Sequence, residues 1–125
     1  MKVPGPAHPI TIAPADVRVR VSFAGKVIAD TTRALVLREA GCAPVFYIAR
    51  EDADMSVFRR SEHKTHCPYK GDASHFTLDG SGKSAENAAW SYEQAYPAVR
   101  VIEGRLAFYP KRIDQIEVLP LPPSS

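Results

Sequence analysis

The 125 residues, with 45% hydrophobic and 24% charged residues, predict one ordinary soluble globular domain. A net charge of +2, with basic and acidic residues interleaved, argues against a nucleic-acid-binding surface, and no segment has the apolar length of a membrane span or a signal peptide. Two cysteines do not make a disulfide framework, so we expect a cytoplasmic protein that binds neither nucleic acid nor membranes.

The chain divides by composition into three parts. Residues 1–15 contain four prolines and predict an extended arm, which either moves freely or lies against the body or a neighbouring subunit. Residues 16–119 are expected to form a single β domain. Residues 120–125 form a proline-rich tail.

Alternation of apolar and polar residues is the main secondary-structure signal. Residues 17–23 alternate strictly and predict a half-buried strand, and residues 26–30 return after Ala24-Gly25 to make a hairpin. Residues 51–58 predict one helical turn and a loop, and residues 97–102 a short extended piece. Further strands are predicted at residues 34–38, 45–48, 74–78, 87–93, 106–109 and 114–118. Many short strands predict a mainly β fold, a curled sheet with a barrel-like body and little helix.

The stretch from Thr65 to Gly71 gathers a thiol, an imidazole, a phenol and an ammonium group around one proline. Pro68 favours the second position of a β-turn, so Cys67 and Lys70 become the first and fourth residues. Gly71 is free to leave the turn with positive φ. A cation beside a thiol favours the reactive thiolate, so Lys70 would activate Cys67. The plainer alternative is a tight turn between two strands, with Cys67 buried and Lys70 solvated.

Several stretches share the pattern of one known family: residues 31–39, 44–48, 67–71, 88–92 and 107–110. Over about residues 17–118 the chain resembles a bacterial family catalogued as domain of unknown function 427. The resemblance implies a compact, mainly β domain around a central pocket, with an architecture similar to that of zinc-binding Mss4-like proteins. It implies no reaction.

The family also carries a nucleotidyltransferase-like label, which the residues argue against. That activity needs a Gly-Ser pair ahead of paired aspartates that hold two metal ions. Asp52 and Asp54 are correctly spaced, but Gly80-Ser81 follows them in the chain. We therefore do not expect this activity.

Zinc is the metal to consider, because His63, His66 and Cys67 lie close together in sequence and His75 follows. A structural site needs four ligands, which related architectures supply as paired Cys-x-x-Cys elements. This chain has no such pair, and Cys42 stands alone. We therefore predict no metal and no cofactor.

The predicted site is centred on Cys67 and Lys70 as catalytic candidates, with Glu39 as a general base or a partner of Lys70. Neighbouring strand residues point to opposite faces, so at most one of Arg38 and Glu39 faces the site. Trp90 and Tyr92 are two residues apart and share a face. The predicted ligand-binding residues are Arg38, Tyr47, Tyr69, Trp90, Tyr92 and Tyr109.

Three functions fit these residues. The first is a pocket that binds a small anionic or polar ligand, with Lys70 on the anionic group and aromatic rings on a planar part. The second is an enzyme that uses Cys67 as a nucleophile or acid-base group. The third is a structural or interaction module without pocket chemistry. The sequence leaves open a homo-oligomer.

Overall fold

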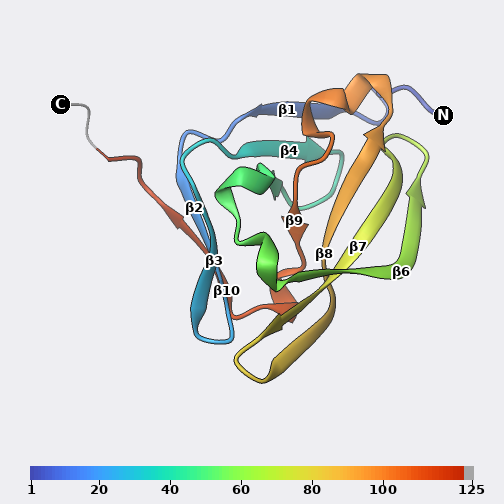
Figure 1. Cartoon of the computed structure of the whole chain (residues 1–125). Coiled ribbons are helices and arrows are strands. Elements are labelled where there is room, and N and C mark those ends of the chain that lie inside the picture. The colour runs from blue at the N-terminus through green and yellow to red at the C-terminus, as the bar shows by residue number, and fades with distance from the viewer. Residues whose placement is uncertain (123–125) are drawn as a thin grey trace.

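The computed structural model describes residues 1–122, which fold into three antiparallel sheets and four short 3₁₀ helices (Figure 1). The mainly β fold is confirmed, and within these residues the sheets curl without closing into a barrel. The same part of the chain contains no helix long and apolar enough to cross a membrane. The end of the predicted tail, residues 123–125, lies outside the described residues.

The first sheet joins part of the predicted arm to the body. Its strands, in the order β1-β4-β5, are β1 (Ile10–Pro14), β4 (Leu35–Glu39) and β5 (Val45–Tyr47). The arm lies against the body here, because β1 pairs with β4 from Ile10 opposite Glu39 to Pro14 opposite Leu35. Sequence reasoning predicted β4 and β5 and missed β1, a short strand that follows Pro9 and ends at Pro14.

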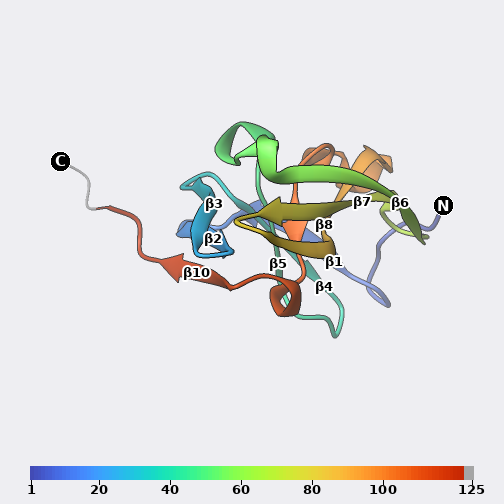
Figure 2. The same ribbon diagram turned by 60° about the horizontal axis from the view of Figure 1, so that its bottom comes forward.

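The second sheet contains the predicted hairpin. Its order is β10-β2-β3, with strands β2 (Arg18–Phe23), β3 (Lys26–Thr31) and β10 (Gln115–Leu119). Ala24 and Gly25 have φ values of 52° and 78°, as a two-residue turn of this kind requires. Figure 2 shows β10 at the outer edge of this sheet.

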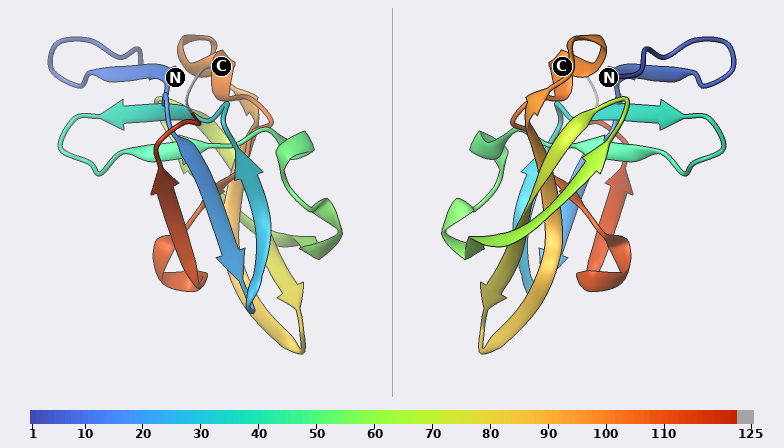
Figure 3. Two further views of the ribbon diagram at one scale, coloured as in Figure 1. Left: turned by 90° about the vertical axis from the view of Figure 1, so that its left-hand side faces the viewer. Right: turned by 90° about the vertical axis from the view of Figure 1, so that its right-hand side faces the viewer.

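The third sheet is the largest and carries the central turn. Its order is β6-β7-β8-β9, with strands β6 (Phe58–Cys67), β7 (Gly71–Gly80), β8 (Lys83–Ala95) and β9 (Ala107–Phe108). Sequence reasoning missed β6, whose side chains are mostly exposed and polar on both faces. Figure 3 shows the long β7–β8 hairpin running across the direction of β1 and β4.

The 3₁₀ helices correct two predictions. The segment expected to form one helical turn contains two, η1 (Arg50–Asp52) and η2 (Met55–Val57). The segment 97–102, expected to be extended, is η3 (Pro97–Ile102), and η4 (Pro110–Arg112) follows β9. Val99 and Ile102 on η3 are fully buried, and the backbone kinks at Val99, whose φ of −123° and ψ of 20° are not helical.

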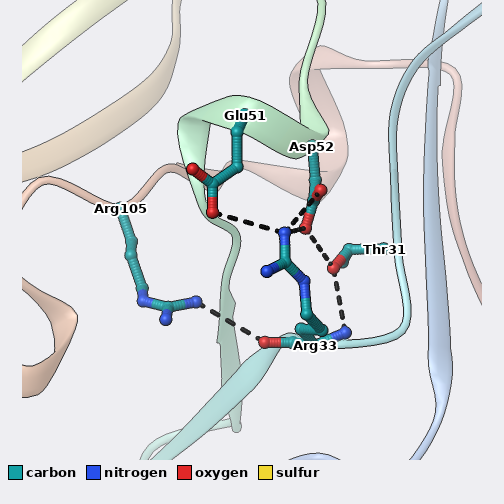
Figure 4. A network of polar contacts seen from close by, with 5 residues as sticks. All are labelled: Thr31, Arg33, Glu51, Asp52 and Arg105. Carbon is teal, nitrogen blue, oxygen red and sulfur yellow. Dashed lines mark hydrogen bonds and ion pairs between the residues drawn. The ribbon is translucent and has the colours of Figure 1, made fainter.

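A polar network fixes η1 to the connection between β3 and β4 (Figure 4). The Thr31 hydroxyl donates to the Asp52 carboxylate over 2.8 Å, and the Arg33 guanidinium donates to the same carboxylate over 2.9 Å. Arg33 also reaches Glu51, and Arg105 donates to the Arg33 carbonyl oxygen. These contacts position the chain that leads out of β5.

Two hydrophobic clusters lie between the sheets. The larger is built around Val19, Val21, Leu78 and Phe108, where the second sheet packs on the third. The smaller combines residues of β4, β5, β7, β8, β9 and η3: Leu37, Tyr47, Ala73, Tyr92, Ala95, Val99, Ile102 and Ala107. The candidate site lies against the smaller cluster.

Candidate functional site

The central turn has the predicted geometry. The Lys70 N–H donates to the Cys67 carbonyl oxygen over 3.3 Å, which closes the β-turn around Pro68. Gly71 leaves the turn with φ of 112°, and a Cβ there would lie 3.0 Å from the Gln94 carbonyl oxygen. The turn therefore requires glycine at this position, both for its backbone angle and for the space beside β8.

Lys70 does not point into water. Its ammonium nitrogen lies 2.5 Å from one carboxylate oxygen of Glu39, and Nε2 of His8 lies 2.6 Å from the other oxygen. The side chains of Lys70 and Glu39 are only 11% and 13% exposed. The His8 ring also stacks on the Tyr69 ring, 4.0 Å between centroids. Three distant segments thus meet at one carboxylate.

Glu39 remains ionised in this setting. Burial by itself would raise the pKa of its carboxyl group, but hydrogen bonds from Lys70 and His8 outweigh burial and hold the pKa below its ordinary value. The result is a carboxylate–ammonium pair that is almost removed from solvent. Such a pair is sensitive to the loss of either partner.

A cavity of about 160 Å³ opens beside this pair. Its lining comprises Leu37, Glu39, Cys42, Ala43, Val45, Tyr47, Thr65, Lys70, Trp90, Tyr92 and Tyr109. An apolar cavity of roughly 150 Å³ is known to hold one benzene molecule, so the space fits a ring-sized ligand. A whole nucleoside triphosphate is too large for it.

Aromatic rings form one wall of the cavity. The Trp90 ring lies 4.4 Å from the Tyr109 ring and meets the Tyr47 ring edge-on at 6.5 Å, all between centroids. The Lys70 ammonium lies 6.0 Å from the centre of the Tyr92 ring. Burial raises the pKa of Tyr47 to about 12, and burial likewise raises the pKa of Tyr92. Both side chains are therefore neutral phenols near pH 7.

The cavity offers more hydrogen-bond donors than acceptors. The Lys70 ammonium group has three N–H donors. One of them donates a hydrogen bond to Glu39, so two remain for a ligand. The Tyr47 and Tyr92 hydroxyls are protonated and able to donate. Both oxygens of Glu39 already accept hydrogen bonds. A ligand that brings acceptor oxygens complements this arrangement.

The structure separates the predicted site residues into two groups. Glu39, Tyr47, Lys70, Trp90, Tyr92 and Tyr109 line the cavity together. Three others do not line it. Arg38 is exposed on the face of β4 opposite Glu39, Tyr69 stacks on His8, and Cys67 is half-buried against the smaller hydrophobic cluster.

Sequence reasoning missed three residues at the site. Cys42, rather than Cys67, lines the cavity. It is exposed in the turn after β4. Thr65 lines the cavity from β6, and His8 reaches Glu39 from the arm. Cys42 lies three residues after Glu39 and Thr65 two residues before Cys67, so closeness to predicted site residues was the available signal for both. His8 reaches Glu39 only through the pairing of β1 with β4.

The residues weighed as zinc ligands have other neighbours. His66 pairs with Asp72 over 2.7 Å, and the His63 ring lies 4.6 Å from the His75 ring. In residues 1–122, no three side chains of histidine, cysteine, aspartate or glutamate form a group that could hold a metal ion. Of the spaced aspartates, Asp52 binds Thr31 and Arg33, and Asp54 caps η2.

A second charged group lies on the opposite face of β8. Glu93 follows Tyr92 and therefore points away from the cavity, where it accepts hydrogen bonds from Arg50 and Arg60. The hydrogen bond from Arg60 lowers the pKa of the Glu93 carboxyl to about 2, against burial and with further hydrogen bonds from Ser74 and Arg50. This group stabilises the sheet from behind the site.

Comparison with known proteins identifies the family of the chain. The profile of a family described as "Domain of unknown function (DUF427)" matches residues 11–119. These bounds include every strand from β2 to β10 and most of β1. No curated protein matches the chain.

Proposed function

The chain belongs to the DUF427 family, whose description names no activity, and from its cavity we propose that the protein binds a small anionic or polar ligand beside Lys70. The observation that carries the proposal is the Lys70–Glu39 pair, 2.5 Å apart and almost buried, at the edge of a cavity walled by aromatic rings. A buried ion pair stabilises a fold only weakly, so its placement at a cavity favours a role in binding.

The ligand in this proposal is a planar or ring-sized molecule with acceptor oxygens. Its oxygens meet the free N–H groups of Lys70 and the hydroxyls of Tyr47 and Tyr92. Its planar part lies against Trp90, as aromatic rings prefer offset or edge contacts. The cavity volume of about 160 Å³ limits the enclosed part to roughly the size of benzene.

The alternative function, an enzyme with Cys67 as its nucleophile, has less support and stays a prediction. The Lys70 ammonium is directed to Glu39, and Cys67 packs with apolar residues outside the cavity lining. A thiol nucleophile needs access to its substrate. The cavity wall instead contains Cys42.

Binding of propanoate, benzoate and inorganic phosphate tests the proposal. The chain has one tryptophan, so intrinsic fluorescence reports on Trp90 at the cavity wall, and calorimetry gives an independent Kd. We expect saturable binding of benzoate, and we expect Lys70→Met to lower the affinity at least about tenfold, because a charge-assisted hydrogen bond contributes roughly 1.5–3 kcal/mol.

Two further variants make the result specific. Lys64→Met removes an exposed lysine of β6 that does not line the cavity, and its affinity for benzoate should equal that of the wild type. Tyr92→Phe keeps the ion pair and removes one donor, so a severalfold loss is expected even if Lys70→Met folds poorly. If none of the three anions binds saturably to the wild-type protein, the proposal is wrong.

A further inference from the structure

We propose that the ligand of this site is an amphipathic carboxylate, whose carboxylate group binds at Lys70 and whose apolar tail occupies a second cavity on the far side of Trp90. This inference rests on the proposed function and adds the chemical class of the ligand. It concerns a second, separate space in the protein. That space has no part in the polar network of Glu39, Lys70 and His8.

The second cavity measures about 150 Å³ and is apolar. Among the described residues, only aliphatic, proline and aromatic side chains line it. Val19 and Val21 of β2, which are fully buried, line it together with Phe46, Phe108 and Ile116. A lining of this kind complements apolar groups of a ligand, because burying apolar surface is favourable. A charged ligand alone would gain nothing here.

The two cavities are neighbours. Ala43, Val45 and Trp90 line both of them, so the polar space and the apolar one adjoin along these three residues. Ala43 is exposed, which brings both cavities to the surface at the turn between β4 and β5. A molecule that passes over this turn reaches both spaces at once.

The chemistry of the two spaces fixes the polarity of the ligand. Lys70 has two N–H donors left and stands in the first cavity, whereas the surface of the second cavity is predominantly apolar. Burying a polar group without a partner costs free energy, so the acceptor oxygens belong at Lys70 and the hydrocarbon beyond Trp90. A space that holds one benzene molecule takes about six carbons.

A series of carboxylates with increasing tails tests the inference: propanoate, hexanoate, octanoate and 3-phenylpropanoate. Each buried CH₂ is expected to raise the affinity about fourfold until the second cavity is filled. Affinity is measured by calorimetry and by the emission of Trp90. We expect octanoate and 3-phenylpropanoate to bind at least tenfold more tightly than propanoate.

Three variants locate the tail. Ile116→Phe fills the second cavity from β10 and should remove the advantage of octanoate while leaving propanoate unchanged. Pro44→Glu places a carboxylate at an exposed position of the same lining without altering the buried core, and should have the same effect. Val118→Phe is the matched control, because Val118 is on the same strand, 51% exposed, and lines neither cavity.

The outcomes separate this inference from the proposal on which it rests. The inference is supported if affinity rises with tail length in the wild-type protein and in Val118→Phe, and if this rise is lost in Ile116→Phe and Pro44→Glu. If propanoate binds and longer tails add nothing, or if the gain survives both cavity variants, the inference is wrong and the pocket at Lys70 stands. If no carboxylate of the series, and neither benzoate nor phosphate, binds the wild-type protein, both fail together.

Discussion

The Lys70 ammonium lies 2.5 Å from the Glu39 carboxylate, although the two residues are 31 positions apart in the chain. Lys70 ends the turn after β6, and Glu39 ends β4, so the contact ties the third sheet to the first. Because both side chains are nearly buried, neither is able to replace its partner with water. The intact pair adds little to the stability of the fold, but losing either partner would leave a nearly buried charge unpaired.

Removing one member of this pair should destabilise the protein. Lys70→Met leaves Glu39 buried with only His8 as a partner, and we expect a loss of about 3 kcal/mol in the free energy of unfolding. The double variant Lys70→Met/Glu39→Leu should lose less than the single one, because no charge is left unpaired. Chemical denaturation of both variants measures the difference, and equal losses would contradict the buried-pair geometry.

Glu93 should make stability depend on pH in the acid range. Its folded pKa is about 2, below the ordinary 4.5, mainly because of the hydrogen bond from Arg60. A depressed pKa gives stability that is fully present above about pH 4.5 and is lost as the pH falls toward 2. Glu93→Gln should therefore lower the free energy of unfolding by roughly 2 kcal/mol at pH 7 and change it very little at pH 2. Unfolding free energies measured at both pH values check this, and an equal cost at each would refute it.

Gly71 should not tolerate a side chain. Gly71→Ala forces an alanine to φ of 112° and places its Cβ 3.0 Å from the Gln94 carbonyl oxygen. We therefore expect the free energy of unfolding to fall by about 2 kcal/mol or more. Gly82→Ala is the matched control, since Gly82 has φ of 76° with nothing within 4 Å of an added Cβ. The free energy of unfolding of this control variant should fall by only about 1 kcal/mol. If thermal unfolding gives equal losses, contact with β8 is not what restricts position 71.

Cys42 should be the more reactive thiol of the native protein. Cys42 is exposed, whereas Cys67 is half-buried against apolar side chains. We expect iodoacetamide to modify Cys42 first at pH 7.5, with equal rates for both cysteines in denaturant, as resolved by peptide mass. Bound benzoate should slow the modification of Cys42, which lines the cavity. Faster modification of Cys67, slowed by Lys70→Met, would instead support the nucleophile hypothesis.

Local signals were enough for the strands that bury one face. The alternation of Val19, Val21 and Phe23 with polar residues predicts β2, and the short Ala24-Gly25 connection predicts the hairpin with β3. Pro68 likewise predicts the turn from Cys67 to Lys70. In each case the conformational preference of a few adjacent residues agrees with the final fold.

The errors occur where burial is decided by distant segments. β6 is an edge strand with polar side chains on both faces, so no alternation marks it. The β-branched residues of η3 favour a strand in isolation, but Pro97 begins two 3₁₀ turns joined by a kink at Val99, and contacts with distant segments bury Val99 and Ile102. At the site, the sequence predicts the Lys70–Glu39 pairing only as one of two alternatives, and it does not assign His8 or Cys42 to the site.

The pairing of β10 with β2 joins the two ends of the domain, from Gln115 opposite Ser22 to Leu119 opposite Arg18. The hairpins β2–β3 and β7–β8 close short loops, whereas this ladder closes almost the whole chain, and loop-closure entropy rises with loop length. We therefore expect β10 to dock late in folding and to open first, with earlier amide exchange along β10 than along β7. Until it docks, the edge of β2 is unpaired, so a nascent chain that lacks its last strand presents a template for aggregation.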